Sequence, residues 1–216
     1  MIKAVIFDFD GVIADTEHLH FEVFRNVLNH QKQDLTENEY YSQYLAYDDK
    51  TFFSKYYENN ELKLDKKLLK RLLKNKSEEF DSLIKNNIKI YPGVVDFIEK
   101  LSVRYDLAIG SGALKKEIVQ ILDVINIAHL FKIIISADEI SNCKPNPEVY
   151  NTVLSRLNNI KGNDISADEC IVIEDSIYGI QAAKSAGMKC MAVTNSYPAK
   201  KLTEADLVVS DYSVSD

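Results

Sequence analysis

Short apolar runs alternate with helical patterns along most of the chain. The runs are rich in Val and Ile and are bounded by polar or Gly residues, which is typical of strands buried on both faces. They lie at residues 2–7, 107–109, 133–135, 171–173, 191–193 and 207–209. Apolar stripes at helical spacing separate most of them: Val94, Val95, Ile98 and Leu101; Ile118, Ile121, Leu122 and Ile125; and Ile177, Ile180 and Ala183. Pro92 is expected near the first position of the first of these helices. This alternation predicts an α/β fold with a parallel sheet.

Residues 17–87 break the alternation, because they contain no convincing strand. Apolar residues recur at helical spacing near both ends of the segment, and a dense aromatic stretch runs from Tyr40 to Tyr57. We therefore expect a helical bundle (17–87) inserted into a core domain formed by residues 1–16 and 88–216. The basic run at 63–76 is expected to form the solvated face of a helix.

Two pairs of acids stand where predicted strands end. Asp8 and Asp10 follow the first strand, and Glu174 and Asp175 follow the strand at 171–173. Ligands of parallel α/β sheets bind beyond the carboxyl ends of the strands. Buried acids are costly unless they are paired or bound to metal, and carboxylate oxygens suit Mg²⁺. The alternative for Asp8 and Asp10 is that they cap the following helix.

A hydroxyl and a lysine follow two further strands. Ser111, between Gly110 and Gly112, precedes a helix, so it is either a phosphate site or an ordinary N-cap. Lys144, flanked by Pro145, is either a point charge for phosphate or a surface lysine. Taken together, the four strand ends predict a site for a divalent cation and a phosphate group, and the joint pattern is more specific than any part of it.

Composition excludes several other classes of protein. The chain has 33 acidic residues against 26 Lys and Arg and a net charge of −7, which disfavours a nucleic-acid partner. No apolar run approaches the ~20 residues that cross a bilayer, and no signal peptide is expected. Three cysteines without CxxC spacing indicate reduced thiols in a cytoplasmic protein. A negative chain must draw an anionic substrate to a local positive site.

The motifs resemble those of a known family. The segment from Asp8 to Thr16, DFDGVIADT, resembles the first motif of the haloacid dehalogenase superfamily. Ser111, Lys144 and the pair Glu174-Asp175 match its second, third and fourth motifs in order. The resemblance covers essentially the whole chain and is closest to the subgroup of β-phosphoglucomutase and small sugar-phosphate phosphatases. It implies a Rossmann-like core carrying a helical cap of the C1 type.

The resemblance also implies roles for the motif residues. Asp8 resembles the nucleophile that forms an aspartyl phosphate, and Asp10 resembles the general acid and base. The Mg²⁺ ligands implied are Asp8, the backbone carbonyl of Asp10, and Asp175, with Glu174 ligating directly or through water. The implied phosphate clamp consists of Ser111, with its neighbour Gly112, and Lys144.

If the expected cap resembles that of the mutase, three of its residues stand at matching places: His20, Lys50 and Lys76. The alternatives are a hinge or helix-surface histidine for His20 and solvated lysines for Lys50 and Lys76. Lys50 stands where an arginine usually binds the distal phosphate of the substrate. A lysine loses the bidentate geometry of arginine, which weakens the mutase hypothesis.

The leading hypothesis is a monomeric Mg²⁺-dependent phosphatase acting on a small phosphorylated metabolite, first of all a sugar phosphate, with no membrane or nucleic-acid partner. The alternative is a phosphomutase using the same aspartyl phosphate. A haloacid dehalogenase would leave Asp10 and the acidic pair Glu174-Asp175 idle. A phosphoacceptor signalling domain would carry no inserted cap.

Overall fold

The computed structural model describes residues 1–45, 47–160, 162 and 164–213. It divides into two compact units. The first comprises Met1–Asp15 and Lys89–Asp216 and is called the α/β unit. The second, Thr16–Ile88, is called the helical unit. These bounds lie one residue from the boundaries that the sequence pattern predicts.

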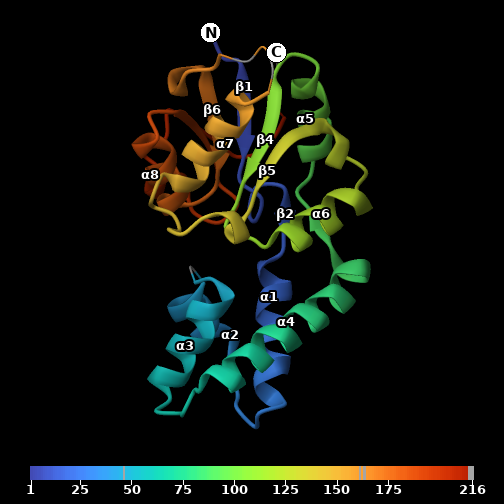
Figure 1. The fold of residues 1–216 in the computed structure, drawn as a ribbon, viewed down its shortest axis with the longest axis vertical. Coiled ribbons are helices and arrows are strands. Elements are labelled where there is room, and N and C mark those ends of the chain that lie inside the picture. Colours follow the sequence, from blue (N-terminus) through green and yellow to red (C-terminus); the bar gives the residue numbers. More distant parts are fainter. Residues whose placement is uncertain (46, 161, 163, 214–216) are drawn as a thin grey trace. The chain divides into compact units, whose positions relative to one another are not determined.

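A six-stranded sheet forms the centre of the α/β unit, and all its neighbouring strands are parallel (Figure 1). Its spatial order is β5-β4-β1-β6-β7-β8. The strands are β1 (Ala4–Phe7), β4 (Asp106–Gly110), β5 (Phe131–Ile135), β6 (Cys170–Glu174), β7 (Lys189–Val193) and β8 (Leu207–Val209). The predicted parallel α/β fold is therefore confirmed. The first strand starts two residues later than expected, although the Lys3 N–H still donates to the Glu169 carbonyl.

Helices cover both faces of the sheet, as its alternating side chains require. Ala4 and Ile6 of β1 share a buried cluster with Tyr150 of α7 and Ala183 of α8, whereas Phe7 packs against Phe97 of α5 on the other face. The helices of this unit are α5 (Val94–Ser102), α6 (Lys115–Val124), α7 (Glu148–Asn158) and α8 (Ile177–Ser185). One expectation is wrong: α5 begins at Val94 behind the N-cap Gly93, so Pro92 precedes the helix.

The chain enters and leaves the helical unit through a small antiparallel pairing that the sequence did not predict. Strand β2 (Ala14–Asp15) pairs with β3 (Lys89–Ile90). Before β2 the chain makes a tight turn, in which the Ile13 N–H donates to the Phe9 carbonyl and Gly11 has φ +78°. Strands of two residues are too short to show an alternating pattern.

The helical unit is built on an aromatic core. It contains α1 (Glu17–Asn29), α2 (Glu37–Glu39), a π-helix (Tyr40–Tyr44), α3 (Asp49–Asn59) and α4 (Lys66–Asn87). Phe24 of α1 stacks on Phe52 of α3 with ring centroids 3.8 Å apart, and Tyr40, Tyr44 and Tyr56 are buried around them. Apart from Ala46, which lies outside the described residues, this unit contains no strand, as expected.

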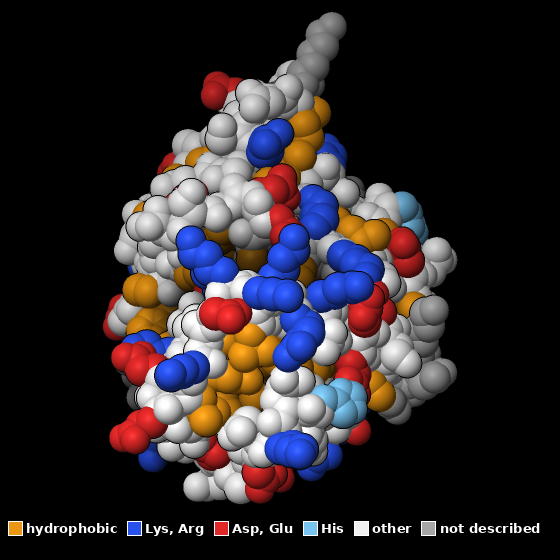
Figure 2. Space-filling view, turned by 60° about the horizontal axis from the view of Figure 1, so that its bottom comes forward, with side chains coloured by type: hydrophobic (Ala, Val, Ile, Leu, Met, Phe, Trp, Pro, Cys, Tyr) orange, Lys and Arg blue, Asp and Glu red, His pale blue; other side chains and the backbone are white. Residues whose placement is uncertain are grey.

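The basic run follows the exposed side of α4 with one exception. Lys66, Lys67, Lys70 and Lys74 are exposed, whereas the Lys76 side chain is fully buried. Lys and Arg side chains are prominent on the face drawn in Figure 2. None of the helices formed by the described residues is long and apolar enough to cross a membrane.

Candidate functional site

Three carboxylates meet at the carboxyl end of the sheet. Asp8 directly follows β1. Glu174 is the last residue of β6, which is hydrogen-bonded to β1, and Asp175 is the residue after it (Figure 1). The Asp8 N–H donates to the Ile173 carbonyl at 2.9 Å, which holds the two strand ends in register. One oxygen from each of the three carboxylates lies within 4.8 Å of the others, and all three residues are buried. We call this group the acidic cluster.

Lys144 joins the acidic cluster from the loop between β5 and α7. Its Nζ lies 2.8 Å from Asp8 Oδ1 and 2.7 Å from Glu174 Oε1, and its side chain is 14% exposed. The alternative of an ordinary surface lysine is therefore wrong. The helix after β1 has Thr16 as its N-cap, so Asp8 and Asp10 do not cap it either.

Glu174 is held by five hydrogen bonds and has no exposed surface. Oε1 accepts from Lys144 Nζ and from the Tyr150 hydroxyl, each at 2.7 Å. Oε2 accepts from the Asp175 and Ser176 N–H groups and from the Ser176 hydroxyl. The carboxylate lies against Gly179 of α8, where a Cβ atom would be 1.7 Å from Oε1. Only glycine leaves this space.

Asp175 is placed by the loop after β7 and by the turn after β1. The Ser196 hydroxyl donates to Asp175 Oδ2, and the Asn195 side chain donates to the Gly11 carbonyl at 2.7 Å. A Cβ atom on Gly11 would lie 1.9 Å from Asp175 Oδ2. Glycine is thus required at position 11 both for its positive φ and for the close approach of this carboxylate.

Burial and like charge set the protonation states of these groups. Burial raises the pKa of Asp8 to about 7, against the opposing effect of Lys144. Burial, then Glu174 and Asp8, raise the pKa of Asp175 well above its usual range. Burial also acts to raise the pKa of Glu174, but the charge of Lys144 and the hydrogen bonds from Lys144 and Tyr150 outweigh it, so that the pKa is lowered overall. Burial opposes the charge on Lys144, but Asp8 and Glu174 outweigh it and raise the pKa.

The acidic cluster fits a divalent cation. Three carboxylates against one ammonium leave a net formal charge of −2 when all four groups are ionised. Mutual repulsion and burial both disfavour that state unless a cation is bound. Carboxylate oxygens are the donors that hard cations such as Mg²⁺ prefer. Because Glu174 is occupied by five donors, Asp8 and Asp175 are the carboxylates best placed to bind a metal directly.

Asp10 is placed differently from the other acids. Its carboxylate is not part of the acidic cluster, and its backbone bridges to Ala14 in the turn after β1. Among the described side chains, those that could hold a cation are therefore Asp8, Glu174 and Asp175. A ligand role for Asp10 through its backbone carbonyl stays a prediction.

Ser111 follows β4 and is buried beside β5. Its N–H donates to the Ile135 carbonyl, and its hydroxyl oxygen accepts from the Ala113 N–H at 3.0 Å. The expected place at a helix N-terminus is wrong, because α6 begins only at Lys115, with Leu114 as its N-cap. The Lys115 N–H is capped instead by Asp138 Oδ2 at 2.9 Å. Gly112 stands in the open turn, where a Cβ atom would meet nothing within 4 Å.

The three predicted cap residues lie within the helical unit. Lys76 is buried, lies 3.0 Å from Asp49 Oδ2, and sits over the Phe80 ring at 4.6 Å. His20 stacks on the same ring at 4.6 Å, and burial, followed by Lys76 and His18, holds its pKa well below 6.5. Lys50 is exposed near the start of α3.

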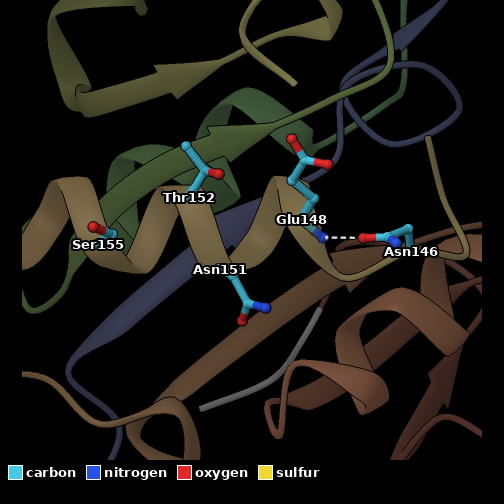
Figure 3. Close-up of a pocket in the computed structure, with 5 residues that line it drawn as sticks. All are labelled: Asn146, Glu148, Asn151, Thr152 and Ser155. Carbon is cyan, nitrogen blue, oxygen red and sulfur yellow. Dashed lines mark hydrogen bonds between the residues drawn. The ribbon is translucent and has the colours of Figure 1, made fainter. Parts of the chain in front are cut away.

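Glu148 holds the loop that leads to Lys144. An open depression along α7 is lined by Asn146, Glu148, Asn151, Thr152 and Ser155, and contains none of the acidic cluster (Figure 3). The Glu148 carboxylate accepts hydrogen bonds from the Ser141 N–H, the Asn142 N–H and the Asn142 side chain at 2.7–2.9 Å. These bonds lower the pKa of Glu148, so its carboxylate is charged at neutral pH.

The buried thiols are not candidate nucleophiles. Burial raises the pKa of Cys170 to about 11 and raises the pKa of Cys190 further. A protonated thiol is a poor nucleophile.

The sequence pattern missed Tyr150 and Gly179 as members of the site. The Tyr150 side chain and the Gly179 backbone reach Glu174 from α7 and α8. Neither of them directly follows a strand together with an acid, so no local signal marked them.

Comparisons with known proteins agree with this architecture. The family model described as haloacid dehalogenase-like hydrolase matches residues 5–193. The phosphorylated carbohydrates phosphatase of Thermotoga maritima is 33% identical over 190 residues, which cover 87% of this chain and 83% of that protein. The fructose-1-phosphate phosphatase of Escherichia coli is 28% identical over 200 residues, covering 88% and 95%. The crystal structure of β-phosphoglucomutase from Clostridium difficile superposes with a TM-score of 0.83 at 26% identity, covering 98% and 92%.

Proposed function

The chain belongs to the haloacid dehalogenase-like hydrolases, and we propose that within this family it is a Mg²⁺-dependent sugar-phosphate phosphatase working through an aspartyl phosphate on Asp8. One observation carries the proposal. Lys144 lies within hydrogen-bond distance of both Asp8 and Glu174, and the acidic cluster of Asp8, Glu174 and Asp175 fits a divalent cation. This arrangement provides a nucleophile, a positive charge for phosphate and a metal site in one place.

The charge of Lys144 offsets the electrostatic repulsion that opposes attack by Asp8 on a phosphoryl group. A carboxylate and a phosphoryl group repel each other, so positive charge must stabilise the phosphoryl oxygens. An ammonium has three N–H donors, and among the described residues Asp8 and Glu174 accept two of them. The third is directed to a phosphoryl oxygen in our proposal. Bound Mg²⁺ supplies further charge neutralisation at the transferring group.

Asp8 and Asp10 divide the reaction into two displacements. An Asp8 oxygen attacks phosphorus, the ester P–O bond breaks, and Asp10 donates its proton to the leaving oxygen. Asp10 then takes a proton from water, the water oxygen attacks phosphorus, and the bond to Asp8 breaks to release inorganic phosphate. Asp10 thereby returns to its protonated state and Asp8 to its carboxylate.

Ser111 and Gly112 complete the proposed phosphate clamp. The Ser111 hydroxyl oxygen already accepts from the Ala113 N–H, which leaves its own O–H as a donor. The open turn at Gly112 lets backbone N–H groups approach an anion. We assign these donors, with Lys144, to the phosphoryl oxygens that do not react.

The similarity to phosphatases of phosphorylated carbohydrates and of fructose 1-phosphate supports a sugar monophosphate as the substrate. We propose that the helical unit is the cap. Of its three candidate substrate residues, Lys50 is exposed, Lys76 is paired with Asp49, and His20 is half-buried and stacked on Phe80. Lys50 is therefore the cap residue best suited to bind a substrate directly.

Inorganic phosphate release tests this proposal. The protein is assayed against a panel of sugar phosphates and other metabolite phosphates, first with Mg²⁺ and then after chelation. The proposal predicts release from one or more sugar monophosphates with Mg²⁺ and none after chelation. Absence of release from the whole panel contradicts it.

A phosphomutase of the β-phosphoglucomutase type is the second candidate, favoured by the 26% identity and matching fold of the Clostridium difficile enzyme. It would use Asp8 in the same way but return the phosphoryl group to the sugar. The pairing of Lys76 with Asp49 and the single-point charge of Lys50 are less suited to a second phosphate. Conversion of β-glucose 1-phosphate to glucose 6-phosphate, primed with the bisphosphate, distinguishes the two.

A further inference from the structure

Tyr150 lies beneath the acidic cluster although it has no place in the proposed chemistry. It belongs to the first turn of α7, is fully buried, and donates its hydroxyl to Glu174 Oε1 at 2.7 Å. That oxygen also accepts from Lys144 Nζ at 2.7 Å. Two donors therefore share one carboxylate oxygen, and one of them is the lysine that contacts Asp8.

The ring of Tyr150 supports the same lysine. Lys144 Nζ lies 4.9 Å from the ring centroid, in the range of a cation–π contact. Space for the ring exists because position 110 in β4 is a glycine, where a Cβ atom would lie 3.2 Å from two ring carbons. Burial, and then the neighbouring carboxylates of Glu174 and Asp8, raise the pKa of Tyr150 well above its usual value and keep the hydroxyl protonated.

The charge left on the shared oxygen, Glu174 Oε1, determines how strongly the Lys144 ammonium is drawn toward Glu174 and away from Asp8. A carboxylate oxygen with a single donor attracts that donor more strongly than one whose charge is partly satisfied by a second. Without the Tyr150 hydroxyl, Glu174 Oε1 would draw the ammonium toward itself. The ammonium would then lie further from Asp8 and from the phosphoryl oxygens.

We propose that Tyr150 is a positioning residue, whose hydroxyl satisfies Glu174 so that Lys144 stays aimed at Asp8 and at the phosphoryl group. This inference rests on the proposed function. Tyr150 itself touches no reacting atom. Its contribution therefore concerns where the charge of Lys144 lies during phosphoryl transfer, when the need for that charge is greatest.

The test compares three variants with the wild type on the best ester of the panel. Tyr150→Phe removes only the hydroxyl and keeps the ring under Lys144. Tyr105→Phe is the control for loss of a tyrosine hydroxyl. Tyr105 directly precedes β4, at the end of that strand away from Gly110. Val153→Ala opens a cavity in the same helix beside Gly110 without touching a charge. For each protein, kcat, KM, the thermal unfolding temperature and the affinity for inorganic phosphate with Mg²⁺ are measured.

We expect Tyr150→Phe to lower kcat on the order of 10-fold, as loss of one hydrogen bond to a charged group implies, with a smaller change in KM. Inorganic phosphate should also bind more weakly. Tyr105→Phe should match the wild type, and Val153→Ala should lower the unfolding temperature while kcat is kept. Equal kcat for Tyr150→Phe and the wild type overturns the proposal, and so does an equal loss of kcat in Val153→Ala.

The phosphate measurement separates this proposal from the proposed function. If the wild type hydrolyses no ester, the function fails, but weaker phosphate binding by Tyr150→Phe than by Val153→Ala still supports the positioning role. If the wild type binds no inorganic phosphate with Mg²⁺, both proposals fail.

Discussion

Glu174 illustrates how much of the site depends on one buried side chain. Its two oxygens accept from Lys144, Tyr150 and Ser176, as well as from a neighbouring backbone N–H, and none of its surface is exposed. Buried carboxylates are tolerated when every oxygen is satisfied in this way. The position of Lys144 in turn follows from the position of Glu174.

Gly179 provides a stability test of this arrangement. Replacing a helical glycine with alanine usually stabilises a protein by about 0.5–1 kcal/mol. In α8 a Cβ atom would lie 1.7 Å from Glu174 Oε1, so Gly179→Ala should instead lower the free energy of unfolding and reduce phosphatase activity. Urea unfolding checks the sign, with Ser185→Ala on the same helix as the control. Stability and activity equal to those of Ser185→Ala would contradict the account.

His20 provides a pH test within the helical unit. Burial, with Lys76 and His18 nearby, holds its folded-state pKa well below 6.5, so below pH 6.5 the unfolded chain binds a proton that the folded chain does not. Stability should fall as the pH drops below 6.5, by up to about 1.4 kcal/mol per pH unit, until the folded-state pKa is reached. His20→Phe should remove this part of the slope between pH 7.5 and 5. An unchanged slope in unfolding measurements would show that His20 is not the titrating group.

At the scale of secondary-structure elements, α7 and the loop before it act together on Lys144. Glu148 accepts three hydrogen bonds from Ser141 and Asn142, and Tyr150, two positions later, reaches Glu174. Glu148 is the first residue of α7, and a carboxylate at a helix N-terminus is also favoured by the helix dipole. The loop and helix thus hold the lysine from both sides.

Glu148→Gln should loosen this loop without unfolding the protein. A neutral amide is a weaker acceptor than a carboxylate, so amide hydrogen exchange at residues 141–144 should become faster and kcat/KM should fall several-fold. Glu99→Gln, an exposed change on α5, is the matched control. Exchange rates at 141–144 that do not differ between the two variants would show that Glu148 does not hold this loop in place.

The sequence pattern predicted the strands whose ends carry the proposed catalytic residues, but not the residues of other elements that hold those residues in place. Asp8, Ser111, Lys144 and Glu174 were found because each lies at a strand end or in the loop after one, and parallel strands end at one edge. Ser111 was placed wrongly at a helix start, since two residues, Gly112 and Ala113, separate it from the N-cap Leu114. Tyr150 could not be found, because it reaches the site from a separate element, through the packing of α7 against the sheet.

The whole molecule carries a net charge of −7, yet its proposed substrate is an anion. Lys144 pairs with two of the three carboxylates of the acidic cluster, Asp8 and Glu174. A bound divalent cation would offset the remaining charge of the cluster. Binding to the folded state alone would link metal occupancy to the stability of the protein.

Magnesium should therefore raise the free energy of unfolding, by about 2.7 kcal/mol at a concentration 100 times its Kd. The effect should be largely lost in Asp175→Asn, because Asp175 is one of the two carboxylates best placed to bind the metal. Denaturant unfolding of both proteins with and without Mg²⁺ measures it. Equal stabilisation of the two proteins would mean that the ion binds elsewhere.

Phosphate release by the wild type and Asp8→Asn, measured side by side on the preferred ester with Mg²⁺, shows whether Asp8 is the nucleophile. We expect release by the wild type and background levels in Asp8→Asn, with the variant folded by circular dichroism. The amide is isosteric, and it removes a carboxylate whose pKa burial raises to about 7, so no loss of fold is expected. Release that survives in folded Asp8→Asn would contradict the assignment of Asp8 as nucleophile.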